Sequence, residues 1–174
     1  MRVYIKKHDN LQVPKRAHCS DTGFDIYSIS DPIVHGDYDE KTNSYKSIDY
    51  IEYKTGVYLN LMEDEVNVYV NIRPRSSLRK YNLLLCNSVG LVDAGYTGEL
   101  IVSFKYIFQP IDIWYFNSCK INYDKIYKKG DKIAQLEFIR GNEYVEFVPV
   151  SEETFSLMEN TSTRKDAGHG STTV

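Results

Sequence analysis

The feature of this sequence that most restricts its fold is the strict alternation of apolar and polar residues between Glu65 and Arg73. Successive side chains of a β-strand point to opposite faces of the sheet, so a strand with one buried face repeats its apolar residues at every second position. The segment is therefore predicted to be a half-buried strand. Its apolar positions are Val66, Val68, Val70 and Ile72, and its polar positions are Asn67, Tyr69, Asn71 and Arg73.

Several other segments predict strands, and none predicts a long helix. Leu100 to Phe108 alternates in the same way, and the 15 tyrosines favour strands over helices. Short strands that are separated by turn residues, without crossover helices between them, are typical of antiparallel barrels and sandwiches. We therefore expect an all-β fold. Its shorter strands are predicted at residues 2–6, 56–61, 82–87, 133–139 and 144–150.

The length of the chain favours a single domain. A chain of 174 residues with 42% hydrophobic content can form one core and is too short for two domains of ordinary size. We expect this domain at residues 1–150, with long loops at 35–50 and 109–128, followed by a flexible polar tail at 151–174. The second loop predicts a packed hairpin or, alternatively, a surface for a protein partner. Its aromatic residues are Trp114, Tyr115, Phe116, Tyr123 and Tyr127.

The composition narrows the range of partners. Lysine and arginine total 21 against 24 acidic residues, a net charge of -3, so no global positive field is available to hold a nucleic acid polymer. Three widely spaced cysteines argue against a disulfide framework and against a paired-cysteine zinc site. No apolar run has the length of a signal peptide or a membrane span, so we expect a protein of the cytoplasm or nucleus that does not enter membranes.

Two segments carry more chemistry than a strand connection needs. Arg75, Ser76 and Ser77 place a guanidinium beside two hydroxyls, which suits a phosphate. The alternative is a serine that caps a short helix beside a surface arginine. Further along the chain, Asp93 follows an apolar strand, where a carboxylate can orient and deprotonate water. The alternative for this aspartate is an ordinary hairpin turn.

Three other segments carry polar groups with simpler alternatives. Asp25 lies among apolar neighbours, where it could hold the water shell of Mg²⁺ or make turn hydrogen bonds. Gln135 is an uncharged amide in an apolar strand, as an ordinary turn and strand would also have. In the tail, Arg164 and the segment 168–172 could close over phosphates or remain disordered.

Together and in this order, the five segments resemble the five motifs of the trimeric dUTPase family. The motifs correspond to residues 21–26, 74–78, 87–99, 130–136 and 164–172. The resemblance implies a jelly-roll β-barrel subunit and a homotrimer whose active sites lie at subunit interfaces. It also implies Mg²⁺-dependent hydrolysis of dUTP to dUMP and pyrophosphate, which keeps uracil out of DNA and supplies dUMP for dTMP synthesis.

The resemblance assigns roles to individual residues. Asp93 would activate the attacking water, and Asp25 would position Mg²⁺ through bound water molecules. Tyr96 would exclude a 2′-hydroxyl, while Asn87 and the backbone near it, at Gly90 and Val92, would read the uracil edge. The phosphate oxygens would be held by Arg75, Ser76, Ser77 and Gln135.

In the tail, the resemblance implies a flap that closes over the site of a neighbouring chain. Arg164, Gly170, Ser171 and Thr172 would clamp the phosphates. His169 stands where the family usually has an aromatic residue that stacks on uracil, and a histidine stacks less well.

Two alternatives to this function remain. A dCTP deaminase shares similar motifs, but its chemistry needs a glutamate where this chain has Ser103. The second alternative is a dUTPase-like regulator that binds a partner through residues 109–128.

Overall fold

The computed structural model describes residues 3–61, 68–93, 95–113, 118–140 and 148–154. The chain divides into two compact units, Met1–Gly141 and Asn142–Val174. All named strands belong to the first unit.

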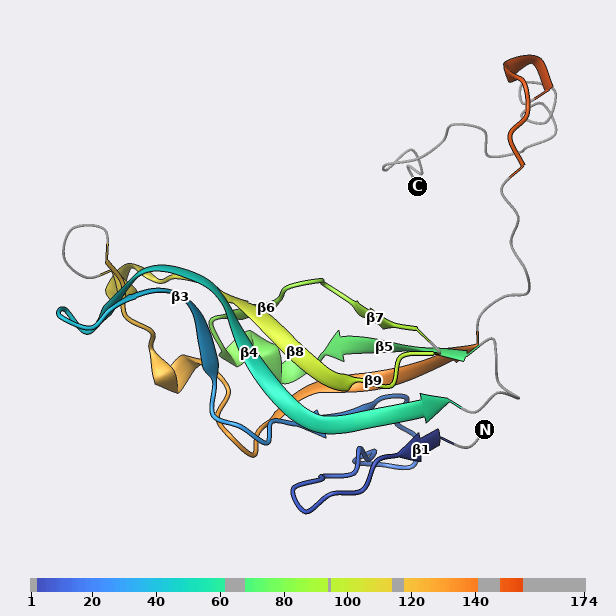
Figure 1. Ribbon diagram of the computed structural model, residues 1–174, viewed down its shortest axis with the longest axis horizontal. Coiled ribbons are helices and arrows are strands. Elements are labelled where there is room, and N and C mark those ends of the chain that lie inside the picture. The colour runs from blue at the N-terminus through green and yellow to red at the C-terminus, as the bar shows by residue number, and fades with distance from the viewer. Residues whose placement is uncertain (1–2, 62–67, 94, 114–117, 141–147, 155–174) are drawn as a thin grey trace, which may run out of the picture. The chain divides into compact units, whose positions relative to one another are not determined.

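The first unit contains two antiparallel sheets, which confirms the predicted all-β class (Figure 1). The first sheet has the order β1-β4-β8-β6, with β3 paired to β4, and the second has the order β2-β9-β5-β7. The strands of the first sheet are β1 (Val3–Ile5), β3 (Ile33–Asp39), β4 (Ser44–Leu61), β6 (Leu83–Leu85) and β8 (Glu99–Tyr106). Those of the second are β2 (Phe24–Tyr27), β5 (Val68–Pro74), β7 (Gly90–Val92) and β9 (Lys132–Arg140). Three 3-10 helices connect them: η2 (Ser76–Lys80), η3 (Pro110–Asp112) and η4 (Tyr123–Lys125).

Alternating residues of the strands form the core. On β5 the apolar residues Val68, Val70 and Ile72 are buried, as the alternation predicts. Asn71, on the predicted polar face, is also buried. On β8 the buried positions are Leu100, Val102, Phe104 and Tyr106, as predicted. The predicted extension of this strand to Phe108 is wrong, because β8 ends at Tyr106 and Phe108 is exposed.

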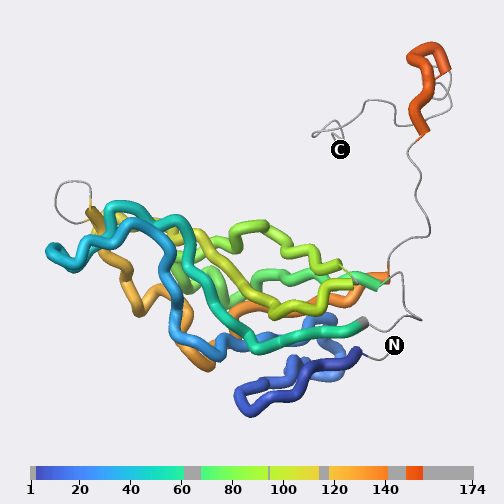
Figure 2. Tube along the Cα trace, viewed as in Figure 1, coloured from blue at the N-terminus to red at the C-terminus, as the bar shows by residue number. Residues whose placement is uncertain are grey.

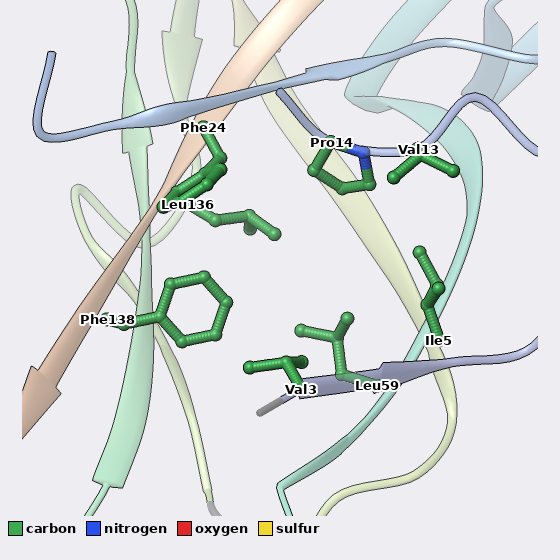
Figure 3. A pocket seen from close by; sticks show the side chains of 8 residues that line it. All are labelled: Val3, Ile5, Val13, Pro14, Phe24, Leu59, Leu136 and Phe138. Atoms are coloured by element: carbon green, nitrogen blue, oxygen red, sulfur yellow. The ribbon is translucent and has the colours of Figure 1, made fainter. Parts of the chain in front are cut away.

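An apolar pocket of about 280 Å³ lies beside this core. It opens between residues of β1, β2, β4 and β9, and Figure 3 shows Phe24, Leu59 and Phe138 around it. All its lining side chains are apolar, so it offers no acid, base or nucleophile for catalysis. The lining residues are Val3, Ile5, Val13, Pro14, Phe24, Leu59, Leu136 and Phe138.

The predicted loop at residues 35–50 is instead a β-hairpin, so this prediction is wrong. β3 pairs with β4 from Ile33 opposite Glu52 to Asp39 opposite Ser44. Asn43, in the connecting turn, has a left-handed φ of 49°, which asparagine tolerates better than most residues. Most side chains of β3 stay at least partly exposed, so the hairpin keeps a polar composition that resembles a loop.

The described part of the segment 109–128 packs on this hairpin (Figure 2). Cys119 forms antiparallel bridges with Tyr45 of β4 and with Ile113. Ile126 and Tyr127 enter the core. The prediction that this segment is packed is confirmed over these residues, while Trp114, Tyr115 and Phe116 lie outside the described part.

The C-terminal predictions fall largely outside the described residues. Of the predicted strand at 144–150, only 148–150 are described, and these residues are not a strand. The tail from residue 155 onward also lies outside them. No helix in the described ranges is long and apolar enough to cross a membrane.

Phe104→Ala tests the core between the sheets. Phe104 is fully buried, so the cavity left by its removal should lower the free energy of unfolding by about 3–5 kcal/mol. Phe108→Ala is the matched control, since Phe108 is 43% exposed and its loss should cost less than about 1 kcal/mol. Urea unfolding at one protein concentration measures both values. Equal losses would contradict this description of the core.

Candidate functional site

The first group of predicted site residues forms a cationic cluster around Asp25 of β2. The Asp25 side chain is buried, and its Oδ1 accepts a hydrogen bond of 2.7 Å from Nε of Arg75. Its Oδ2 lies 2.9 Å from Nζ of Lys132, the first residue of β9. Two cations thus surround one carboxylate, and the excess positive charge suits an anion such as a phosphate.

The same contacts keep Lys132 charged. A hydrogen bond with Asp25, together with the negative charge of that carboxylate, raises the pKa of Lys132. The sequence pattern did not indicate Lys132 as a site residue. Its role arises from the pairing of β2 with β9, which places Asp25 opposite Gln135.

Two further predicted phosphate ligands belong to the cationic cluster. Nη1 of Arg75 donates to Oγ of Ser77 at 3.2 Å, and Nε2 of Gln135 donates to the carbonyl oxygen of Pro74 at 3.4 Å. Gln135 also packs on Gly23, where a Cβ would lie 2.6 Å from the Gln135 Oε1 atom. Glycine at position 23 therefore leaves room for this amide.

Ser76 does not cap a helix as one alternative predicted. It is the first residue of η2, Arg75 occupies the N-cap position, and no side chain makes a capping hydrogen bond there. The hydroxyls of Ser76 and Ser77 therefore do not cap this helix. The prediction that they bind a phosphate is compatible with this geometry.

The second group of predicted site residues lines a separate pocket of about 240 Å³, which we call the hairpin pocket. Asn87, Gly90, Val92, Asp93 and Tyr96 all contribute to it. The turn after β7 is closed by a 3.0 Å hydrogen bond from the backbone N–H of Tyr96 to the carbonyl oxygen of Asp93. Asp93 is exposed, so its carboxylate is accessible to water and to a ligand.

Contacts within the hairpin pocket hold Tyr96 and Asn87. The hydroxyl of Tyr96 donates to the carbonyl oxygen of Glu99 at 3.1 Å, so the ring, rather than the hydroxyl, is available to a ligand. A Cβ at Gly90 would lie 3.1 Å from Nδ2 of Asn87 and equally close to Ile72 of β5. Glycine at position 90 lets the Asn87 amide approach the strand closely.

Asp93 of the hairpin pocket and Arg75 of the cationic cluster lie far apart along β5. Val92, which precedes Asp93, pairs with Val70. Arg75 follows Val70 by five residues, which at about 3.3 Å per residue of strand is roughly 16 Å. The hairpin pocket is lined by none of Asp25, Arg75 and Gln135. One chain therefore does not bring its two groups of site residues together.

The described residues do not form a metal centre. No group of three or more histidine, cysteine or acidic side chains is placed to hold an ion within them. Asp25, the predicted Mg²⁺ residue, already contacts two cations with its two oxygens. In this conformation it does not fit a further cation. The predicted tail residues Arg164, His169, Gly170, Ser171 and Thr172 lie outside the described part of the chain.

Comparisons with known proteins identify the family of the chain. The dUTPase family model matches residues 9–173. The deoxyuridine 5'-triphosphate nucleotidohydrolase of Corynebacterium efficiens is 34% identical over 97% of this chain and 75% of that protein. The enzyme of the same name from Mycobacterium leprae is 31% identical over 96% of this chain and 91% of that protein.

Solved structures show a similar fold. A variant of the Staphylococcus bacteriophage 80alpha dUTPase with dUpNHpp has a TM-score of 0.65 and 22% identity, over 99% of both chains. A variant of the dUTPase from phage phi11 of S. aureus has a TM-score of 0.58 and 21% identity, over 87% of this chain and 97% of that one. The family model and the curated relatives cover almost the whole sequence, and so the chain belongs to the dUTPase family.

Proposed function

We propose that the protein hydrolyses dUTP to dUMP and pyrophosphate in sites shared between the chains of a homotrimer. The observation that carries the proposal is the separation of the cationic cluster from the hairpin pocket along β5. A nucleotide links its base and phosphates within one small molecule, so it needs both groups at the same place. A second copy of the chain would supply the missing group at each site.

Exposed apolar side chains around the hairpin pocket support this assembly. Leu91 and Ile101 line the pocket and are 64% and 43% exposed. Leu84 of β6 and Val89 are also exposed. Exposed apolar side chains such as Leu91 and Ile101, which line the same pocket, favour contact with another chain. The two antiparallel sheets are likewise compatible with the jelly-roll subunit that the resemblance implies.

The proposed chemistry uses Asp93 as the general base. Its carboxylate takes a proton from a water molecule whose oxygen forms a bond to the α-phosphorus of dUTP. The bond from this phosphorus to the bridging oxygen breaks, and pyrophosphate leaves. Arg75, Ser76, Ser77 and Gln135 of another copy hold the phosphates, since phosphoryl transfer depends mainly on positioning and charge neutralisation.

The hairpin pocket would provide the selectivity. The ring of Tyr96 is held by its hydrogen bond to Glu99 and would block a ribose 2′-hydroxyl. Asn87 offers both a donor and an acceptor to the uracil edge. Ser103 lies on β8 where a deaminase would need its glutamate, so hydrolysis is favoured over deamination.

Mg²⁺ enters this proposal only as a counter-ion of the triphosphate. When bound, it would neutralise phosphate charge. Since Asp25 is engaged by Arg75 and Lys132, no step above depends on Asp25 holding the metal. The tail contacts, the cytoplasmic or nuclear location and the protein partner for residues 109–128 stay predictions.

Asp93→Asn tests the general base. It should lower kcat for pyrophosphate release from dUTP by about 10²–10⁴-fold, because the amide cannot accept the proton of the attacking water. Asp93 is exposed, so the melting temperature should not change. Asp37→Asn, on the exposed face of β3, is the control and should keep full activity. Hydrolysis of dUTP at the normal rate by the Asp93 variant would rule out this role.

Mixed assemblies test the shared site. Chains with Asp93→Asn and chains with Arg75→Ala, each inactive alone, should regain about one quarter of normal activity when co-assembled in equal amounts. Each site then receives an intact Asp93 in half of the cases and, independently, an intact Arg75 in half of the cases, so both are intact in about one quarter of the sites. As a control, Asp93→Asn mixed with Asn87→Ala should stay inactive, since both changes affect the same pocket. Absence of recovery in the first mixture would contradict the shared site.

A further inference from the structure

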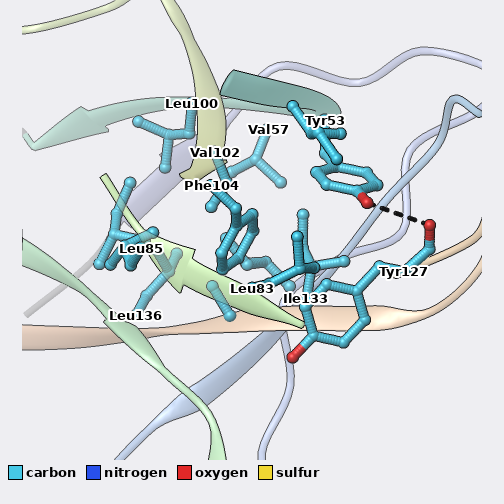
Figure 4. Close-up of a cluster of buried hydrophobic side chains, with 14 of the residues drawn as sticks. Tyr53, Val57, Leu83, Leu85, Leu100, Val102, Phe104, Tyr127, Ile133 and Leu136 are labelled. Atoms are coloured by element: carbon cyan, nitrogen blue, oxygen red, sulfur yellow. Dashed lines mark hydrogen bonds between the residues drawn. The ribbon is translucent and has the colours of Figure 1, made fainter. Parts of the chain in front are cut away.

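Tyr127, in the segment 109–128, is buried in the core, where its hydroxyl group has no hydrogen-bond partner among the described residues. Its ring packs on Tyr53 and Phe104, with centroids 6.1 and 5.5 Å away (Figure 4). It also packs on Tyr81, with the ring centroids 4.3 Å apart. The residue is 1% exposed, and its hydroxyl oxygen makes no hydrogen bond within the described residues. Burying a hydroxyl without a partner is unfavourable, so phenylalanine would satisfy the packing better. Packing in the core therefore does not explain why this residue is a tyrosine.

Two of the groups that act on this hydroxyl, Ser77 and Arg75, belong to the cationic cluster. Burial raises the pKa of Tyr127 to about 12, while the Ser77 hydroxyl and the positive charge of Arg75 oppose the rise. Tyr81, on which the Tyr127 ring packs, directly follows η2, the short helix that carries Ser77. The Tyr127 ring thus lies beside this helix, although its hydroxyl makes no hydrogen bond to Ser77. Instead, Oγ of Ser77 accepts from Nη1 of Arg75 at 3.2 Å.

We propose that Tyr127 is a positioning residue that orients Ser77 toward a bound phosphate. The inference rests on the proposed function of the cationic cluster. When a phosphate oxygen takes the guanidinium of Arg75, Oγ of Ser77 loses that donor. It then accepts a hydrogen bond from the Tyr127 hydroxyl, and its own proton points to the phosphate.

The chemistry of the two hydroxyls supports this order of contacts. A serine hydroxyl has one proton and two acceptor positions, so it can accept from Tyr127 and donate to an anion at the same time. Hydrogen bonds in such a chain polarise and strengthen one another at a buried site. The hydroxyl that is unpaired in the empty protein would gain its partner when the ligand binds. Residues 109–128 would in this way contribute to the site through the core.

Tyr127→Phe removes only this hydroxyl and tests the proposal. The KM for dUTP should rise roughly five- to tenfold while kcat stays within about twofold, since one hydrogen bond in the binding of phosphate is weakened. The melting temperature should not fall, because the empty protein loses no hydrogen bond. An unchanged KM would overturn the proposal.

Tyr106→Phe is the matched control. The Tyr106 hydroxyl is also buried, but it donates to Asp112 at 2.9 Å and accepts from the backbone N–H of Asn122 at 3.0 Å. Its removal should lower the melting temperature and leave the KM unchanged. If Tyr127→Phe behaved like this control, a structural role would replace the positioning role.

A double-mutant cycle with Ser77→Ala locates the effect. In the Ser77→Ala background, Tyr127→Phe should change the KM by less than about twofold, because the group that it orients is absent. A full effect in that background would overturn the link to Ser77. The Kd for inorganic tripolyphosphate keeps the test separate from hydrolysis. In Tyr127→Phe this Kd should rise about as much as the KM. The measurement does not require that the unaltered protein hydrolyses dUTP. An unchanged Kd would overturn the proposal.

Discussion

The pairing of β5 with β7 on one side and β9 on the other is the constraint on which the rest of the structure depends. A slip of one residue in this register would turn every β5 side chain to the opposite face of the sheet. In the observed register Arg73 lies opposite Gln135, and Ile72 lies opposite Gly90. The same hydrogen bonds thus bury the core face of β5 and place Gln135 of the cationic cluster and Gly90 of the hairpin pocket on opposite sides of this strand.

This placement separates binding groups that one nucleotide must contact together. The cationic cluster carries net positive charge and can hold an anion, while the exposed carboxylate of Asp93 lines the hairpin pocket. Assembly of several chains would then create the complete site and cover the exposed Leu91 and Ile101.

The segment 109–128 combines a packed interior with an exposed exterior. Ile126 and Tyr127 fill the core, whereas Ile111 and Ile113 are 84% and 64% exposed. The segment leans on the β3–β4 hairpin through Cys119 and Tyr45, so both regions form one extension of the first sheet. In our proposal, the buried half of this extension orients Ser77, a proposed phosphate ligand, without touching the bound nucleotide.

The sequence by itself determined the strand character of β5 and β8 and the family of the chain, and it supplied the candidate site residues, because alternation and motif order are local properties. It did not reveal the β3–β4 hairpin, whose exposed polar side chains resemble a loop. Nor did it reveal Lys132 as a partner of Asp25, since that contact depends on the pairing of β2 with β9 from distant parts of the chain. Only the tertiary structure decided that Asp93 and Arg75 lie far apart, because the register of a sheet is set by the packing of its whole buried face.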